Sequence, residues 1–175
     1  MNSERNNVVV AVGAVLAVLL QLIVAPAVSI AFAQPNFLLA YVLVAAIVRP
    51  LEAGPVLPFV LGLAYDFLGT GPLGGMAFLF VLVSFAAARA FSVLDNDTLF
   101  MPLTIFAVGT LAVEMLYAVM LIALGFSANP LDAFLYRALP CALFDCVVGL
   151  VLYPIMARVL VSGSQDRGLR SPRLR

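Results

Sequence analysis

The most distinctive stretch of this sequence is GLAYDFLGTGPLG, residues 62–74. A short apolar run ends in Asp66, and a turn rich in glycine and proline then leads directly into the next apolar run. The first N–H groups of a helix have no partner within the helix, and the helix dipole favours an anion beside them. We therefore expect Asp66 either to accept hydrogen bonds from this turn or from the start of the following helix, or to contact a partner protein.

The rest of the chain is equally apolar. Of its 175 residues 65% are hydrophobic and 10% are charged, with a mean hydropathy of +1.16, whereas soluble domains contain roughly 25% charged residues. This composition excludes a soluble globular enzyme. The chain has no histidine and its nine basic residues are all arginine, which excludes a histidine base, a Schiff-base lysine and a histidine-ligated metal. We expect no catalytic residue, no cofactor and no metal.

Six apolar runs predict an all-α fold with six transmembrane helices. They are Val8–Ala25, Phe37–Val48, Val56–Leu68, Leu73–Phe91, Met101–Phe126 and Phe134–Val161. The second and third are shorter than the roughly 20 residues that a spanning helix needs. They are either two short crossings or one re-entrant hairpin buried in protein.

Proline and capping residues indicate where these helices begin and end. Pro26 closes the first run, and Asp97 and Thr98 stand where the N-cap of the fifth helix is expected. Pro140 and Pro154 lie inside the sixth run, so we expect that helix to be kinked.

The arginines predict the orientation in the membrane. Eight arginines belong to segments on the side of the two termini: Arg5, Arg49, Arg89, Arg158, Arg167, Arg170, Arg173 and Arg175. Only Arg137, at the start of the sixth run, is nearer the opposite side. This asymmetry favours an even number of crossings with both termini cytoplasmic. A re-entrant hairpin would place Arg49 in the bilayer, which favours two short crossings. We expect residues 1–161 to form one membrane domain, with the first helix retained rather than cleaved as a signal peptide, and residues 162–175 a disordered basic tail.

Four ionisable residues fall within or at the edge of the predicted spans: Asp66, Glu114, Arg137 and Asp145. A charge at mid-bilayer costs about 2.5–3.5 kcal/mol on insertion scales, so each needs compensation. Asp66 and Arg137 are expected at compatible depths for an ion pair. Two carboxyls then remain, which are protonated, hydrogen-bonded inside the bundle, or paired with a cation of a partner or substrate.

Small residues and thiols complete the set of candidate contacts. Gly13-xxx-Ala17 and Ala86-xxx-Ala90 match the spacing that lets membrane helices approach closely. Cys141 and Cys146 are five residues apart, so they face different sides of a helix. We expect them to pack as free thiols.

The stretch 62–74, together with Gln34-Pro35-Asn36-Phe37, resembles the MreD family of rod shape-determining membrane proteins. The specific likeness covers residues 34–80. The chain departs from the family at Asn36, where members often carry an acid. The candidate residues for partner binding or structure are Asp66, Gly69, Gly71, Pro72, Gly74, Glu114, Arg137 and Asp145.

The resemblance implies a non-enzymatic subunit of the machinery that elongates the peptidoglycan wall, in the inner membrane of a bacterium. The implied partners are an MreC-like single-span protein and, through it, the RodA polymerase, its transpeptidase and MreB filaments, with membrane lipid around the bundle and no nucleic acid. The implied fold resembles the substrate-binding components of energy-coupling-factor transporters.

That likeness also supplies an alternative function, a substrate-binding component of a vitamin-type transporter. The outward loops 69–72 and 126–133 offer few hydrogen-bond donors for a ligand, which favours the scaffold. An ion- or proton-coupled carrier would depend on Glu114 and Asp145 alone. On the scaffold interpretation, we expect a partner's transmembrane helix to dock on the face that carries Asp66 and the small residues of the fourth span.

Overall fold

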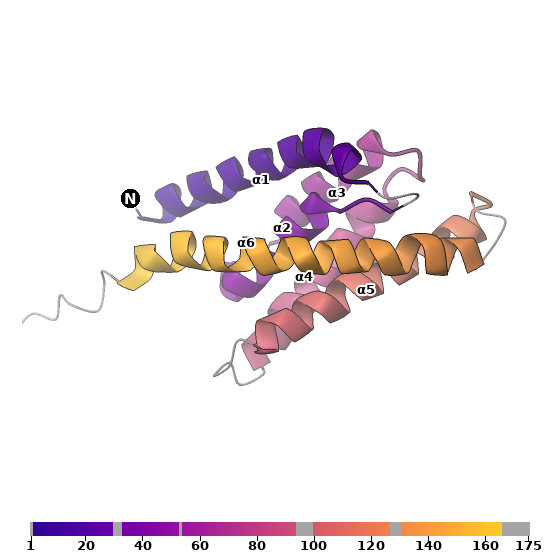
Figure 1. Ribbon diagram of the computed structural model, residues 1–175. Helices are drawn as coiled ribbons and strands as arrows, with labels where there is room; N and C mark the ends of the chain where they lie inside the picture. Colours follow the sequence, from indigo (N-terminus) through magenta and orange to yellow (C-terminus); the bar gives the residue numbers. More distant parts are fainter. Residues whose placement is uncertain (1, 30–32, 53, 94–99, 127–130, 166–175) are drawn as a thin grey trace, which may run out of the picture.

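The computed structural model of the chain describes residues 2–29, 33–52, 54–93, 100–126 and 131–165. Within these ranges the fold is all-helical, as predicted, with six α-helices and no strand (Figure 1). The helices are α1 (Asn2–Ala27), α2 (Phe37–Val48), α3 (Val56–Leu68), α4 (Gly75–Val93), α5 (Phe100–Ala123) and α6 (Leu139–Gln165). A 3₁₀ turn, Pro50–Glu52, follows α2, and a π-helical segment, Asp132–Ala138, precedes α6.

Helix α2 is the centre of the bundle. It contacts all five other helices, and nine of its twelve residues are buried. A helix that is apolar on every side is typical of such a position. The helix ends at Val48, because the next residue, Arg49, precedes Pro50, and a residue before proline is disfavoured in the helical conformation. At 1.5 Å per residue α2 is about 18 Å long, well short of the roughly 30 Å hydrocarbon core of a bilayer.

The five outer helices expose large apolar side chains. On α1, for example, Val8, Val15 and Ile23 are each at least 60% exposed. Within the described residues, four helices are long and apolar enough to cross a membrane: α1, α4, α5 and α6. An apolar surface of this extent is compatible with lipid and would aggregate in water.

The bounds of α2 to α5 agree with the sequence-based prediction to within three residues, whereas α1 begins at Asn2, before the predicted Val8, and α6 begins at Leu139, after the predicted Phe134. Both short helices, α2 and α3, begin and end at the predicted residues. Helix α4 begins two residues later than predicted, after Gly74, whose φ of +87° is incompatible with a helix start at Leu73. Helix α5 ends three residues early, before Gly125 at φ +78°. The predicted cap residues Asp97 and Thr98 lie outside the described residues.

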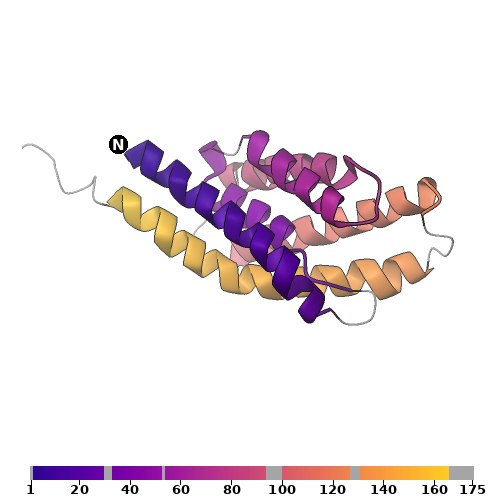
Figure 2. The same cartoon turned by 90° about the horizontal axis from the view of Figure 1, so that it is seen from above.

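The sixth helix differs in detail from the expected kink. Pro140 has no N–H to bond the carbonyl four residues earlier, and the π-helical segment lies directly before it. Its closing bond runs from the Leu139 N–H to the Phe134 carbonyl, five residues back. Pro154 lies inside α6, which bows without a break (Figure 2). The helix continues to Gln165, four residues into the predicted tail; residues 166–175 lie outside the described ranges.

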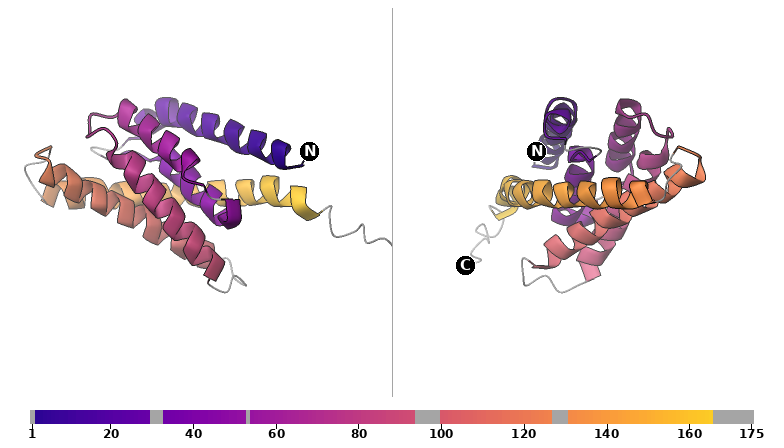
Figure 3. Two further views of the ribbon diagram at one scale, coloured as in Figure 1. Left: turned by 180° about the vertical axis from the view of Figure 1, so that it is seen from behind. Right: turned by 45° about the vertical axis from the view of Figure 1, so that its right-hand side comes forward.

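The connections separate into two ends of the bundle. The start of α1, the end of α2, the start of α3 and the end of α6 lie toward one end, and so do the end of α4 and the start of α5 (Figures 1 and 3). The end of α1, the start of α2, the turn from α3 to α4 and the end of α5 lie toward the other. We call the first the terminal end and the second the turn end.

Candidate functional site: two capped helix starts

At the turn end, the carboxylate of Asp66 caps the start of α4. Asp66 is the third-last residue of α3 and is 3% exposed. Its Oδ2 accepts hydrogen bonds from the backbone N–H groups of Gly74 (2.8 Å) and Ala77 (3.3 Å), and its Oδ1 accepts one from Met76 (3.1 Å). These are the amides that lack partners within α4, and the helix dipole adds to the attraction. The buried negative charge is therefore compensated by the chain's own backbone.

Close contact between α3 and α4 makes this cap possible. A Cβ on Gly62 would lie 2.5 Å from the Ala77 Cα, so glycine allows the two backbones to touch. A Cβ on Gly71 would collide with the Tyr117 hydroxyl. Only a residue that tolerates positive φ can occupy position 74 without strain. The glycines of the predicted motif thus fix the turn against its neighbours.

The remaining motif residues close the turn. The N–H of Gly69 donates to the Tyr65 carbonyl at 3.1 Å and ends α3. The carbonyl of Pro72 accepts from the Gly75 N–H at 3.3 Å and leads into α4. All of the candidate residues from Asp66 to Gly74 therefore lie together in one connection.

A second cap, assembled from three parts of the chain, closes the start of α2. The Asn36 side chain accepts from the Leu39 N–H (2.9 Å), as an N-cap residue does. The Asn36 N–H donates to Oδ1 of Asp145 on α6 (2.6 Å), and the Phe37 N–H donates to Oε1 of Gln21 on α1 (2.8 Å). We call Gln21, Asn36 and Asp145 the α2 cap.

The α2 cap is fully inside the protein. Asp145 is 0% exposed and Asn36 1% exposed. Among the described residues, Asp145 Oδ2 and Asn36 Nδ2 have no hydrogen-bond partner. Backbone outside a helix is tolerated at membrane depth only where protein surrounds it, and this cap provides that surrounding for the start of α2.

Sequence reasoning missed Gln21. Its Nε2 also donates to the Pro35 carbonyl at 3.3 Å, so one side chain holds both sides of the connection into α2. The available signal was a lone amide inside the apolar run Val8–Ala25, where a polar side chain needs a partner.

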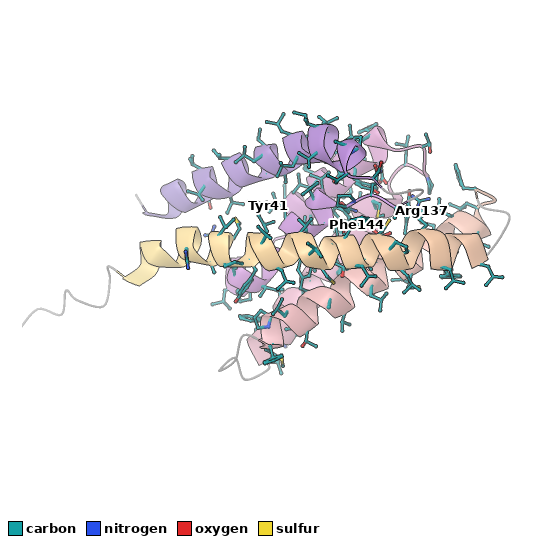
Figure 4. The ribbon with its side chains drawn as sticks, viewed as in Figure 1. Tyr41, Arg137 and Phe144 are labelled. Atoms are coloured by element: carbon teal, nitrogen blue, oxygen red, sulfur yellow. The ribbon has the colours of Figure 1, made fainter. Side chains whose placement is uncertain are left out.

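Arg137 and Glu114 form a third polar group. The Arg137 guanidinium carbon lies 5.2 Å from the centroid of the Tyr117 ring, a cation–π geometry. Glu114 on α5 is 4% exposed and lies within electrostatic range of Arg137. Figure 4 shows Arg137 toward the turn end and Tyr41 nearer the terminal end. The structure thus gives Arg137 an aromatic partner and gives Asp66 the amides of α4, in place of the ion pair expected between them.

The small residues of the Gly13-xxx-Ala17 pattern on α1 pack against other helices of the same chain. The Tyr41 hydroxyl of α2 donates to the Val10 carbonyl at 2.7 Å, and a Cβ on Gly13 would lie 2.6 Å from that hydroxyl. Ala17 is buried. By contrast, Ala86 of the second pattern is exposed on α4.

Both cysteines are free thiols, and Cys146 Sγ lies 3.7 Å from the Thr110 hydroxyl. In the part of the chain that the structure describes, no three cysteine or acidic side chains are grouped to hold a metal ion. Asp66 and Asp145 accept hydrogen bonds from backbone amides. These hydrogen bonds join helices: Asp66 joins α3 to the start of α4, and Asp145 joins α6 to the start of α2.

These features define a helical membrane protein whose buried polar groups organise its own helix starts. The chain belongs to the MreD family: the family model described as rod shape-determining protein MreD matches residues 3–162, nearly the whole chain. The resemblance seen in residues 34–80 is thereby confirmed and extended. No curated protein and no solved structure matches the chain. The family is one of shape-determining membrane proteins of the rod complex.

Proposed function

We propose that this protein is a non-enzymatic scaffold of the cell-elongation complex in the bacterial inner membrane. It binds an MreC-like single-span protein through helix–helix contacts and, through that partner, the RodA polymerase, its transpeptidase and MreB filaments. The observation that carries the proposal is that Asp66 accepts three backbone N–H groups at the start of α4 and Asp145 accepts the Asn36 N–H, so both residues hold helices of this chain together. A function exerted through outer helix surfaces then follows more readily than one exerted at an internal site.

We further propose that the chain crosses the membrane six times, with both termini cytoplasmic. The start of α1 and the end of α6 share one end of the bundle (Figure 1), which an even number of crossings requires. Eight of the nine arginines belong to the segments on that side, in agreement with the positive-inside rule. The proposed fold is that of the substrate-binding components of energy-coupling-factor transporters.

The proposed docking surface is the outer face of α3 and α4, and its basis differs from the sequence-based expectation. Asp66 is buried against α4 and is not available to a partner. The outer face instead carries exposed aromatic side chains beside the small Ala86: Phe67 is 69%, Phe78 65% and Phe85 68% exposed. Phe78, Phe85 and Ala86 lie at helical spacing on one side of α4. Aromatic rings beside a small residue provide ridges and a groove for a helix.

Disulfide crosslinking in membranes tests this surface. In a background with both native cysteines replaced by serine, Phe67→Cys and Ala86→Cys should crosslink to cysteines placed along the transmembrane span of the MreC-like partner. Val119→Cys on α5 and Val147→Cys on α6 are matched controls, because both positions are exposed, and should not crosslink. Crosslinks confined to α5 and α6 would overturn the placement.

A pull-down in mild detergent separates the scaffold from the transporter component. Recovery of cell-wall synthesis proteins supports the scaffold, and recovery of an ATPase with coupling subunits would refute it. Glu114→Gln tests the carrier: unchanged growth and rod shape would show that no carboxylate at this position is required.

A further inference from the structure

Two polar atoms of the α2 cap are left over after its hydrogen bonds have formed. The Asn36 side-chain oxygen accepts the Leu39 N–H, and Asp145 Oδ1 accepts the Asn36 N–H. In the part of the chain that the structure describes, Asn36 Nδ2 and Asp145 Oδ2 have no hydrogen-bond partner. Because the bond to Leu39 fixes which end of the Asn36 amide is the oxygen, Nδ2 is an unpaired donor and Oδ2 an unpaired acceptor.

Three helices enclose these two atoms. Asn36 directly precedes α2 and Asp145 lies on α6, while Glu114 of α5 lies near the Asn36 side chain. Helices α2, α5 and α6 pack against one another, and Figure 4 labels the adjacent Phe144 near the middle of α6. Asn36, Asp145 and Glu114 are 1%, 0% and 4% exposed, so bulk water does not reach them. A buried donor or acceptor that has lost its hydration needs a replacement partner.

The chemistry of the three groups selects the ligand. Asp145 Oδ2 requires a hydrogen-bond donor, Asn36 Nδ2 requires an acceptor, and the Glu114 carboxyl adds further oxygens beside them. A cation would face the hydrogens of Nδ2, and an anion would face two carboxyl groups. A water molecule both donates and accepts, and buried waters make about three hydrogen bonds to groups of this kind.

We propose that the α2 cap binds one water molecule. Its oxygen accepts a hydrogen bond from Asn36 Nδ2, one of its hydrogens bonds Asp145 Oδ2, and the other is directed at the Glu114 carboxyl. The bound water joins α2, α5 and α6 where the chain enters α2, and it completes the hydrogen bonds of the cap.

An experimental structure of the full-length protein in lipid nanodiscs, at a resolution that shows ordered water, tests the site. One density peak should lie about 2.7–3.2 Å from both Asn36 Nδ2 and Asp145 Oδ2, the range of a hydrogen bond. Ordered side chains with no peak between them, or a direct bond from Nδ2 to either carboxyl, would overturn the proposal. A peak with six or more oxygen ligands at about 2.3–2.6 Å would identify a metal cation and would also overturn it.

X-ray radiolysis, in which bound water yields hydroxyl radicals that oxidise adjacent side chains, tests the site in solution. Leu39 and Leu43 are both 0% exposed, but Leu39 bonds Asn36 and Leu43 lies one turn farther from the cap. Leu39 should therefore be oxidised and Leu43 spared. Equal oxidation of the two leucines would overturn the site.

Two variants complete the radiolysis experiment. Asp145→Leu replaces the carboxyl by an apolar side chain of similar length, and should lower the oxidation of Leu39 to the level of Leu43. Ser84→Ala is the control, because it removes a buried hydroxyl of α4 at the terminal end, and should leave the oxidation of Leu39 unchanged. Oxidation of Leu39 that persists in Asp145→Leu, with the helical circular dichroism of the parent, would overturn the proposal. If Asp145→Leu loses that circular dichroism, the comparison of Leu39 with Leu43 in the parent decides.

Discussion

At the scale of single residues, the charges inside the bundle are compensated in two different ways. Asp66 accepts three backbone N–H groups at the start of α4, where unpaired amides and the helix dipole stabilise an anion. Asp145 accepts one N–H at the start of α2 through its Oδ1, and its Oδ2 has no partner among the described residues. Glu114 and Arg137 remain, one acid and one base within electrostatic range. The chain's own backbone therefore satisfies Asp66 at both oxygens, whereas Asp145 is satisfied at one.

The Asp66 cap predicts a measurable loss of stability. In Asp66→Ala, the three amides at the start of α4 lose a buried charged acceptor. We expect the free energy of unfolding in detergent to fall by about 1–3 kcal/mol, the cost of leaving buried donors unpaired. Thr104→Ala removes an exposed hydroxyl that bonds the Phe100 carbonyl of its own helix, and should change stability by less than about 0.5 kcal/mol. Equal effects of the two variants would contradict the role of Asp66.

At the scale of elements, the sequence predicted the features that depend on neighbouring residues and missed those that form only when distant segments pack together. The bounds of α2 and α3 follow from uninterrupted apolar runs between prolines and glycines, and capping of α4 by Asp66 was one of the two roles expected. The α2 cap was not predictable, because Asn36 and Asp145 are 109 residues apart and meet only when α6 packs on α2. In the sequence, Gln21 is a single polar residue in an apolar run, and nothing there indicates which groups it bonds.

The α2 cap explains how asparagine serves at a position where family resemblance leads one to expect an acid. Aspartate would accept the Leu39 N–H equally well. It would also place a third carboxyl beside Asp145, which accepts the Asn36 N–H, and near Glu114. We expect Asn36→Asp to destabilise the protein by about 3 kcal/mol, the scale for an uncompensated buried charge.

A second substitution controls this prediction. Asp145→Asn keeps an oxygen for the Asn36 N–H and removes one carboxyl, so Asn36→Asp/Asp145→Asn should recover most of the loss in thermal unfolding. A double variant no more stable than Asn36→Asp would show that charge repulsion is not the cause.

The contact of α3 with α4 predicts a glycine dependence that differs by position. In Gly62→Ala, the new Cβ meets the backbone of Met76 and Ala77 within 2.8 Å, so the helices must separate and withdraw Asp66 from its amides. We expect a loss of about 1–3 kcal/mol, typical of overpacking. In Gly54→Ala, the new Cβ meets nothing within 4 Å, so thermal unfolding should be nearly unchanged. Similar melting temperatures for both variants would argue against close helix contact.

At the scale of the whole molecule, two short helices have to be reconciled with the thickness of a bilayer. Helices α2 and α3 have 12 and 13 residues, or about 18–20 Å each. The buried Ala33, Pro35 and Asn36 extend the path of α2 without a helix. The turn at residues 69–74 does the same for α3. Protein around these segments replaces the hydrogen bonds that lipid cannot supply.

Labelling of single cysteines decides between two short crossings and a re-entrant hairpin. In a background without native cysteines, Leu51→Cys lies between α2 and α3 at a side chain that is 94% exposed, and Thr70→Cys lies in the turn between α3 and α4. If both helices cross, a membrane-impermeant maleimide should label Leu51→Cys only from the cytoplasmic side and Thr70→Cys only from the opposite side. A hairpin opening outward would bury position 51, together with the charge of Arg49, at a cost of about 2.5–3.5 kcal/mol. It would leave Leu51→Cys unlabelled from either side, and the six-crossing topology would then be wrong although the helices themselves are correctly assigned.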